Sequence, residues 1–119
     1  MDIEQLQTRM RRGEAFHQLR VLDGLWIVLR VDGRNFSRFT RTNFKKPFDE
    51  RFHDAMLGAA QRLLLEFSAL YVYTQSDEIS VLLGPSFSLF DREVEKLVSL
   101  SASTAASSLS LSFQKEVQC

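Results

Sequence analysis

Three acidic residues are the strongest chemical signal in this sequence. Asp32 follows an apolar run, and Asp77 and Glu78 stand side by side between two further apolar runs. Carboxylate oxygens are the ligands that Mg²⁺ prefers, and a site with few protein ligands leaves room for water and substrate phosphates. Two such ions can activate an attacking hydroxyl and stabilise a departing pyrophosphate. We therefore take Asp32 and Asp77 as candidate metal ligands and Glu78 as a third catalytic candidate.

The residues after Asp32 suit the binding of phosphate. Gly33 permits a close approach to the backbone, and Arg34, Asn35 and Ser37 supply donors within one short loop. Such a loop can surround a triphosphate with backbone and side-chain N–H groups. It is not a P-loop, because no Gly-Lys-Ser or Gly-Lys-Thr follows. A solvated surface loop is the alternative interpretation.

Strand ends are expected to bring these acids together. Residues 25–31 form an apolar, partly β-branched run, which predicts a buried strand that ends at Asp32. Runs 70–74 and 79–83 are separated by four residues, which favours an antiparallel hairpin with Asp77 in its turn. Alternation places Glu78 on the face opposite Asp77, where it could orient the site or pair with a base such as Arg34.

Helical patterns surround these strands. Asp2 with Gln5 predicts a capping box and a helix to about residue 12. A second helix is expected from about residue 49, with an apolar stripe of Phe48, Phe52, Met56, Ala59, Leu63 and Phe67. A third is expected from about Leu89 through the Ser- and Ala-rich residues 99–112, with Phe90, Val94, Leu97 and Ser101 on one side; a flexible linker is the alternative for this stretch.

This order predicts an α+β fold of the ferredoxin-like or polymerase-palm type, with an antiparallel sheet and helices on one face. The last strand of that plan has no counterpart, so we expect residues 1–119 to be a single N-terminal palm domain that is incomplete at its C-terminus.

Composition sets broad limits. The 119 residues are 45% hydrophobic with a formal net charge of zero, which predicts one soluble domain and gives no overall sign of a nucleic-acid partner. The basic residues that surround Asp32 are a local exception that suits phosphate. A single cysteine, and no visible signal peptide or membrane span, lead us to expect a cytoplasmic protein.

Three blocks of the sequence resemble one known family. The blocks are Val31-Asp32-Gly33-Arg34-Asn35-Phe36-Ser37-Arg38-Phe39, residues 46–52 (KPFDERF) and residues 73–80 (YTQSDEIS). Their order and spacing are similar to those of the tRNA(His) guanylyltransferases, and most similar to the bacterial and archaeal guanylyltransferase-like proteins.

The resemblance implies an unusual reaction. The family adds nucleotides, typically G, to the 5′ end of tRNA in the 3′–5′ direction, with two Mg²⁺ ions on a polymerase-like palm. ATP or GTP activates the 5′ end before the 3′-hydroxyl of an incoming nucleotide attacks it. The resemblance implies a metal site of Asp32, Gly33 (through its carbonyl) and Asp77. It implies nucleotide contacts from Asp32, Gly33, Arg34, Asn35, Phe36, Ser37, Lys46, Ser76, Asp77, Arg92 and Lys96. It also implies tRNA and nucleoside triphosphates as partners and a dimer or tetramer.

Two departures keep alternatives open. Residues 91–96 carry acids where relatives carry more bases. Family members are also roughly twice this long. A truncated, inactive palm relic or an interaction module is therefore the alternative function. A different palm enzyme, such as a nucleotide cyclase, would explain the acids but not the Lys46-Pro47 block.

Overall fold

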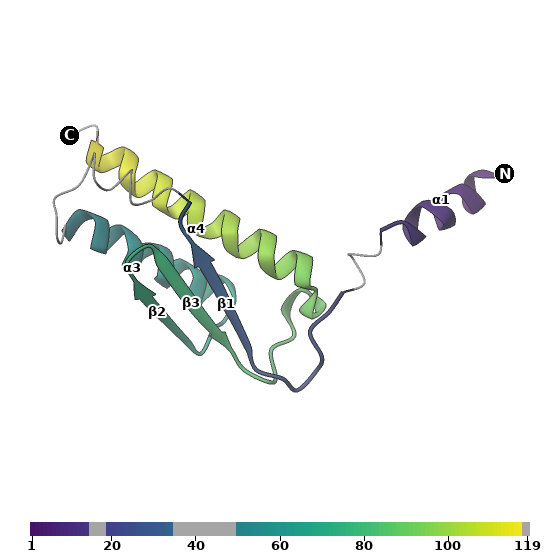
Figure 1. Ribbon diagram of the computed structural model, residues 1–119, viewed down its shortest axis with the longest axis horizontal. Helices are drawn as coiled ribbons and strands as arrows, with labels where there is room; N and C mark the ends of the chain where they lie inside the picture. Colours follow the sequence, from purple (N-terminus) through teal and green to yellow (C-terminus); the bar gives the residue numbers. More distant parts are fainter. Residues whose placement is uncertain (15–18, 35–49, 118–119) are drawn as a thin grey trace.

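The computed structural model describes residues 1–14, 19–34 and 50–117, with side chains to residue 114. Its elements are α1 (Ile3–Arg12), β1 (Ile27–Asp32), α3 (Glu50–Glu66), β2 (Tyr71–Gln75), β3 (Glu78–Leu83), the 3₁₀ helix η2 (Leu89–Arg92) and α4 (Val94–Val117). The antiparallel sheet has strand order β1-β3-β2 and lies beside α3 and α4 (Figure 1). This arrangement confirms the α+β, palm-type fold that the sequence predicts.

The core lies between the inner face of the sheet and the two helices. Period two along β1 buries Ile27 and Leu29 and exposes Val28 and Arg30. The buried cluster also contains Met56, Ala59, Ala60, Leu63, Phe67, Ile79, Val81, Leu83, Leu97 and Ala105. The apolar stripe of this helix is therefore part of the core, as expected, from the half-buried Phe52 to Phe67. Phe48 lies outside the described residues.

The outward side of the sheet, which we call the open face, is arranged in three ranks set by the strand register. Each rank has one residue from β1, one from β3 and one from β2. The ranks are Asp32, Glu78 and Gln75; then Arg30, Ser80 and Tyr73; then Val28, Leu82 and Tyr71. Directly paired residues point to the same side of a sheet. The open face therefore changes from acidic at one end, through a polar middle rank, to apolar at the other.

The Ser- and Ala-rich stretch is helical, not a linker. Ser101 and Ala105 are buried, and a small-residue side allows α4 to lie closely against α3. Near the far end of the pair, Phe113 stacks on Phe52 with ring centroids 6.2 Å apart. The Ser101 hydroxyl donates to the carbonyl of Val98, so its burial leaves no polar atom unpaired.

The last helix begins five residues later than the sequence predicts. Phe90, Asp91 and Arg92 all have positive φ, between 54° and 57°, which breaks the chain direction between η2 and α4. Non-glycine residues rarely adopt this left-handed conformation. The expectation that Phe90 shares one helix side with Val94, Leu97 and Ser101 is wrong, because Phe90 lies before α4 begins. Phe90 is exposed, and its ring makes an edge contact with Phe67.

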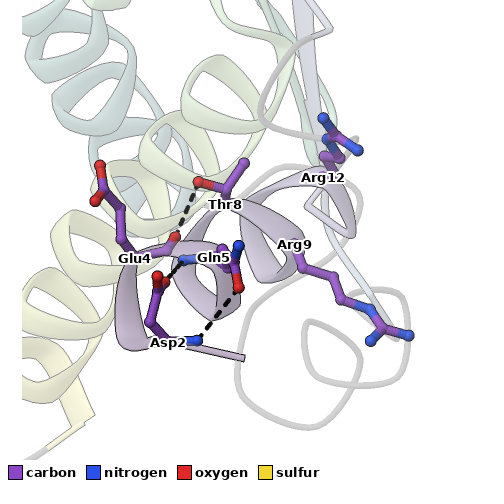
Figure 2. A pocket seen from close by; sticks show the side chains of 6 residues that line it. All are labelled: Asp2, Glu4, Gln5, Thr8, Arg9 and Arg12. Atoms are coloured by element: carbon purple, nitrogen blue, oxygen red, sulfur yellow. Dashed lines mark hydrogen bonds between the residues drawn. The ribbon is translucent and has the colours of Figure 1, made fainter.

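Helix α1 is separate from the core. Its capping box is present as expected: the Asp2 carboxylate accepts from the Gln5 backbone, and the Gln5 side chain accepts from the Asp2 backbone (Figure 2). Gly13 ends it with φ −71°, so the glycine does not use its left-handed freedom there. None of its residues is buried, and the apolar stripe of Ile3, Leu6 and Met10 faces outward.

Candidate functional site

The acids lie at one corner of the sheet. Asp32 is the last residue of β1 and is exposed, while Asp77 lies half-buried in the turn between β2 and β3. The Gly33 backbone N–H donates to the Asp77 carbonyl oxygen at 3.1 Å, which joins the end of β1 to the hairpin turn. The prediction that these two strand ends meet is therefore confirmed, and we call this region the acid corner.

Glu78 pairs with a base other than the one that the sequence suggested. As the register partner of Asp32 it shares the open face with that residue. Its carboxylate is ion-paired with Arg30, two residues before Asp32, and not with Arg34. A hydrogen bond to Glu78, and then the charge of Glu78, raise the pKa of the Arg30 guanidinium above its ordinary value. Arg30 is a residue of this corner that the sequence pattern did not single out.

The hairpin turn is strained at Ser76. The loop between β2 and β3 has two residues, not the four expected, and of these Ser76 alone has positive φ, at 56°. This is the pattern of a type II′ turn, in which glycine is the usual first residue. Non-glycine strain of this kind is often kept at functional sites.

Replacing Ser76 with glycine is expected to raise the free energy of unfolding by about 0.5–1 kcal/mol, because relief of the left-handed strain exceeds the added entropy of an unfolded glycine. Urea unfolding measures this change. Ser68→Gly is the matched control, since Ser68 also has positive φ (48°) but lies in the α3–β2 connection. Loss of stability in Ser76→Gly would contradict the strain.

The donor set at the acid corner fits a hard cation that keeps most of its water. No group of three His, Cys, Asp or Glu side chains in residues 1–14, 19–34 and 50–114 is arranged to hold a metal. Asp32 and Asp77 offer carboxylates and Gly33 a carbonyl, while Glu78 is committed to Arg30. Mg²⁺ is typically bound by one or two carboxylates plus substrate phosphates, so this small set is chemically sufficient.

Several predicted nucleotide contacts lie outside the described residues. These are Asn35, Phe36, Ser37 and Lys46. Of the same group, Arg34 is described and exposed, directly after Gly33. The acid corner and the base that follows it are therefore the part of the predicted site that the structure brings together.

Arg92 and Lys96 do not join the acid corner. Arg92 is only 3% exposed and precedes α4 instead of lying in it. Its guanidinium donates to the carbonyls of Val21, Leu22, Leu25 and Phe87 at 2.8–3.2 Å. Three of these carbonyls precede β1 and that of Phe87 follows β3. The start of β1 is about 17 Å from its far end at 3.3 Å per residue.

Lys96 is exposed in the first turn of α4, next to this buried arginine. The nucleotide contacts expected of Arg92 and Lys96 therefore stay a prediction, made at a place apart from the acid corner. The burial of Arg92 could not be predicted, because a buried arginine and an exposed one are identical in sequence. Its task here is to hold residues 21–25 against the turn that precedes α4.

A surface hollow in the described residues lies elsewhere. It is lined by Asp2, Glu4, Gln5, Thr8, Arg9 and Arg12, all on α1 and its N-cap (Figure 2). Asp2, Gln5 and Thr8 make the capping-box hydrogen bonds and the bond from the Thr8 hydroxyl to the Glu4 carbonyl. One helix surface of this kind offers no convergent chemistry, so the acid corner remains the candidate site.

A β-α-β-β-α order with carboxylates at the end of β1 and in the β2–β3 turn is the arrangement of a polymerase-palm fold. The family model described as tRNAHis guanylyltransferase matches residues 7–118. A tRNA(His) guanylyltransferase from Neurospora crassa is 42% identical over 86 residues, which are 71% of this chain and 29% of the relative. The chain belongs to the tRNA(His) guanylyltransferase family.

Solved structures support the same relationship. A bacterial tRNA(His) guanylyltransferase-like protein in complex with GTP has a TM-score of 0.85 at 28% identity, over 93% of this chain and 53% of that one. The corresponding complex with ATP has a TM-score of 0.87 at 28% identity, over 95% and 52%. The chain thus spans about half of these structures and about a third of the curated relatives it matches.

A search of the described helices for a membrane span found none that is both long and apolar enough.

Proposed function

We propose that this chain is the metal- and nucleotide-binding part of a nucleotidyltransferase that adds a nucleotide, typically G, to the 5′ end of tRNA in tRNA maturation or repair. The observation that carries the proposal is the acid corner, where the Gly33–Asp77 hydrogen bond places two acidic strand ends together on a palm sheet. The similarity of this chain to proteins solved with GTP and with ATP supports nucleotide substrates.

The roles of the residues follow from their positions. Asp32 and Asp77 would hold Mg²⁺, two ions in the proposed reaction, together with the Gly33 carbonyl. When bound, these ions would neutralise phosphate charge and lower the pKa of an attacking hydroxyl. We propose triphosphate contacts from Arg34, Asn35, Phe36, Ser37, Lys46 and Ser76. Arg92 and Lys96 are not part of this set.

The reaction needs two successive transfers at one corner. In the first transfer the 5′-phosphate of the RNA takes a nucleoside monophosphate from ATP or GTP, and pyrophosphate leaves. In the second, the 3′-hydroxyl of an incoming nucleotide attacks that 5′ phosphorus, and the activating nucleoside monophosphate leaves. The protein's part is to hold both phosphate groups in line, which is the main protein contribution to phosphate transfer. Asp32 is exposed at a strand end, where its carboxylate can reach a bound phosphate.

The remaining expectations concern partners. We propose tRNA and nucleoside triphosphates as substrates and a cytoplasmic location. A dimer or tetramer is expected because α1 exposes an apolar stripe and β1 is an edge strand in the sheet of described residues.

Label transfer tests the proposal. The protein is incubated with 5′-shortened tRNA, Mg²⁺ and labelled GTP, and label in the RNA is counted. Transfer that depends on both Mg²⁺ and Asp32 supports the proposal. No transfer, together with no binding of Mg²⁺–GTP, would favour an inactive palm relic or an interaction module.

Glu78 is expected to matter less than the aspartates. Its carboxylate is engaged by Arg30, so Glu78→Gln should lower label transfer by about tenfold, well short of the effect at a metal ligand. The comparison of kcat for Glu78→Gln and Asp32→Asn in the same assay checks this ranking. Equal losses would show that Glu78 leaves Arg30 and binds metal directly.

A further inference from the structure

One base of the acid corner lies on the same face of the sheet as Asp32. Arg30 is in β1, two residues before Asp32, and its side chain is 59% exposed. Its guanidinium forms an ion pair with the carboxylate of Glu78, whose side chain is 31% exposed. Of the acids Asp32, Asp77 and Glu78, the last is the one with an ion pair in the described part of the chain. The pair therefore belongs to the electrostatics of the candidate site.

The strand register shows how this pair positions Glu78. Glu78 pairs directly with Asp32, and directly opposite residues have Cβ atoms about 5 Å apart on the same face. A carboxylate at that distance can join the Asp32 carboxylate on one cation. Arg30 pairs instead with Ser80, so it is a diagonal neighbour of Glu78 at about 7–8 Å. The ion pair therefore draws the Glu78 carboxylate along the sheet, away from the rank that contains Asp32.

The pair also sets the charge that an incoming cation meets. With Glu78 neutralised by Arg30, the carboxylate charges of Asp32 and Asp77 remain. Arg30 is about 7 Å along the strand from Asp32, where its charge repels a bare divalent cation and attracts a phosphate anion. Mg²⁺ is commonly bound by few carboxylates together with substrate phosphates. This balance favours a cation that binds with its triphosphate over a cation alone.

We infer that Arg30 is a positioning residue that holds Glu78 out of the cation's ligand set, and so makes cation binding at the acid corner depend on the triphosphate. Without this base, Glu78 would turn toward the cation beside Asp32, and three carboxylates would bind the bare ion. With it, the triphosphate supplies the ligand that Glu78 does not. This inference rests on the proposed function, because it takes Asp32 and Asp77 as the metal ligands.

Removal of the base, with an apolar stem kept in its place, tests the inference. Mn²⁺ binding to the wild type and to Arg30→Met is followed by electron paramagnetic resonance, with and without GTP. Arg30→Met should bind Mn²⁺ alone at least about fivefold more tightly, because Glu78 becomes a third carboxylate ligand. The factor by which GTP strengthens Mn²⁺ binding should fall by at least the same amount. No change in either quantity would overturn the positioning role.

A second substitution shows whether Glu78 carries the effect. In the double variant Arg30→Met with Glu78→Gln the third carboxylate is absent, so the affinity for Mn²⁺ alone should return to within about twofold of the wild type. Tight binding retained in the double variant would overturn the inference. Arg62→Met is the matched control, because Arg62 forms an exposed ion pair with Glu66 on α3. It should bind Mn²⁺ as the wild type does, and unchanged melting temperatures establish that each variant folds.

Ionic strength separates this effect of position from a simple effect of charge. Salt screens a charge that acts across solvent, whereas a ligand bonded to the cation is affected much less. The difference between Arg30→Met and the wild type should therefore persist from about 0.1 M to about 0.5 M KCl. A difference that disappears at the higher salt would show that Arg30 acts by its charge alone, which would overturn the positioning role.

The same titrations distinguish this inference from the proposed function. Mn²⁺–GTP binding that depends on Asp32, with Arg30→Met indistinguishable from the wild type, would overturn the positioning role alone. Mn²⁺–GTP binding that does not depend on Asp32, or no such binding by the wild type, would overturn the proposed metal site and this inference with it. Tighter binding of Mn²⁺ alone by Arg30→Met, reversed by Glu78→Gln and persistent in salt, supports the inference.

Discussion

Replacing Asp32 with asparagine is expected to lower label transfer to the tRNA 5′ end by at least about 1,000-fold, which corresponds to about 4 kcal/mol of transition-state stabilisation. The amide keeps the shape of the side chain but removes the charge that a divalent cation needs. Asp32 is exposed at the end of β1, so the fold should survive the change. The measurement is kcat/KM for GTP with 5′-shortened tRNA.

The same change at Asp77 should have a similar effect, and the double variant should be little worse than either single one, because both carboxylates serve one site. Asp54→Asn is the matched control: Asp54 is an exposed carboxylate on α3, away from the sheet corner. A loss of less than tenfold in Asp32→Asn would remove this residue from the metal site.

Arg92 should be critical for stability and not for nucleotide binding. Replacing it with methionine is expected to lower the free energy of unfolding by about 3–5 kcal/mol, because four backbone carbonyls would lose a charged donor in a buried place. Its ion pair with Asp23 adds little, since that carboxylate is fully exposed at 3.9 Å. Urea unfolding measures the loss.

Two further variants sharpen this prediction. Arg92→Lys should also be strongly destabilised, because an ammonium group cannot reproduce the planar fork that reaches carbonyls on two segments. Lys96→Met, which changes an exposed charge in the first turn of α4, should stay within about 0.5 kcal/mol of the wild type. A small effect in Arg92→Met would mean that these hydrogen bonds do not hold residues 21–25 in place.

The sequence predicted the elements that follow simple periodic rules. The Asp2–Gln5 capping box, the strand that ends at Asp32 and the stripe on α3 are all local patterns, and each is confirmed. The meeting of Asp32 with the hairpin turn could also be predicted, because adjacent antiparallel strands with a short turn fix which ends lie together.

Other features depend on contacts that no local pattern encodes. The left-handed residues 90–92 make the last helix begin later than predicted. The segment whose carbonyls accept hydrogen bonds from Arg92 is about 70 residues away in sequence. The Arg30–Glu78 pair depends on the register of β1 against β3, which places a diagonal partner within reach. Family resemblance, not geometry, suggested phosphate contacts for Arg92.

The proposed function requires a cation held by Asp32 and Asp77 together with a triphosphate. Electron paramagnetic resonance of Mn²⁺, used in place of Mg²⁺, counts bound ions in the presence and absence of GTP. We expect saturable Mn²⁺ binding that strengthens when GTP is present. This binding should be lost in Asp32→Asn and Asp77→Asn and retained in Asp54→Asn. Equal Mn²⁺–GTP binding by all of these proteins would contradict a metal site at Asp32 and Asp77.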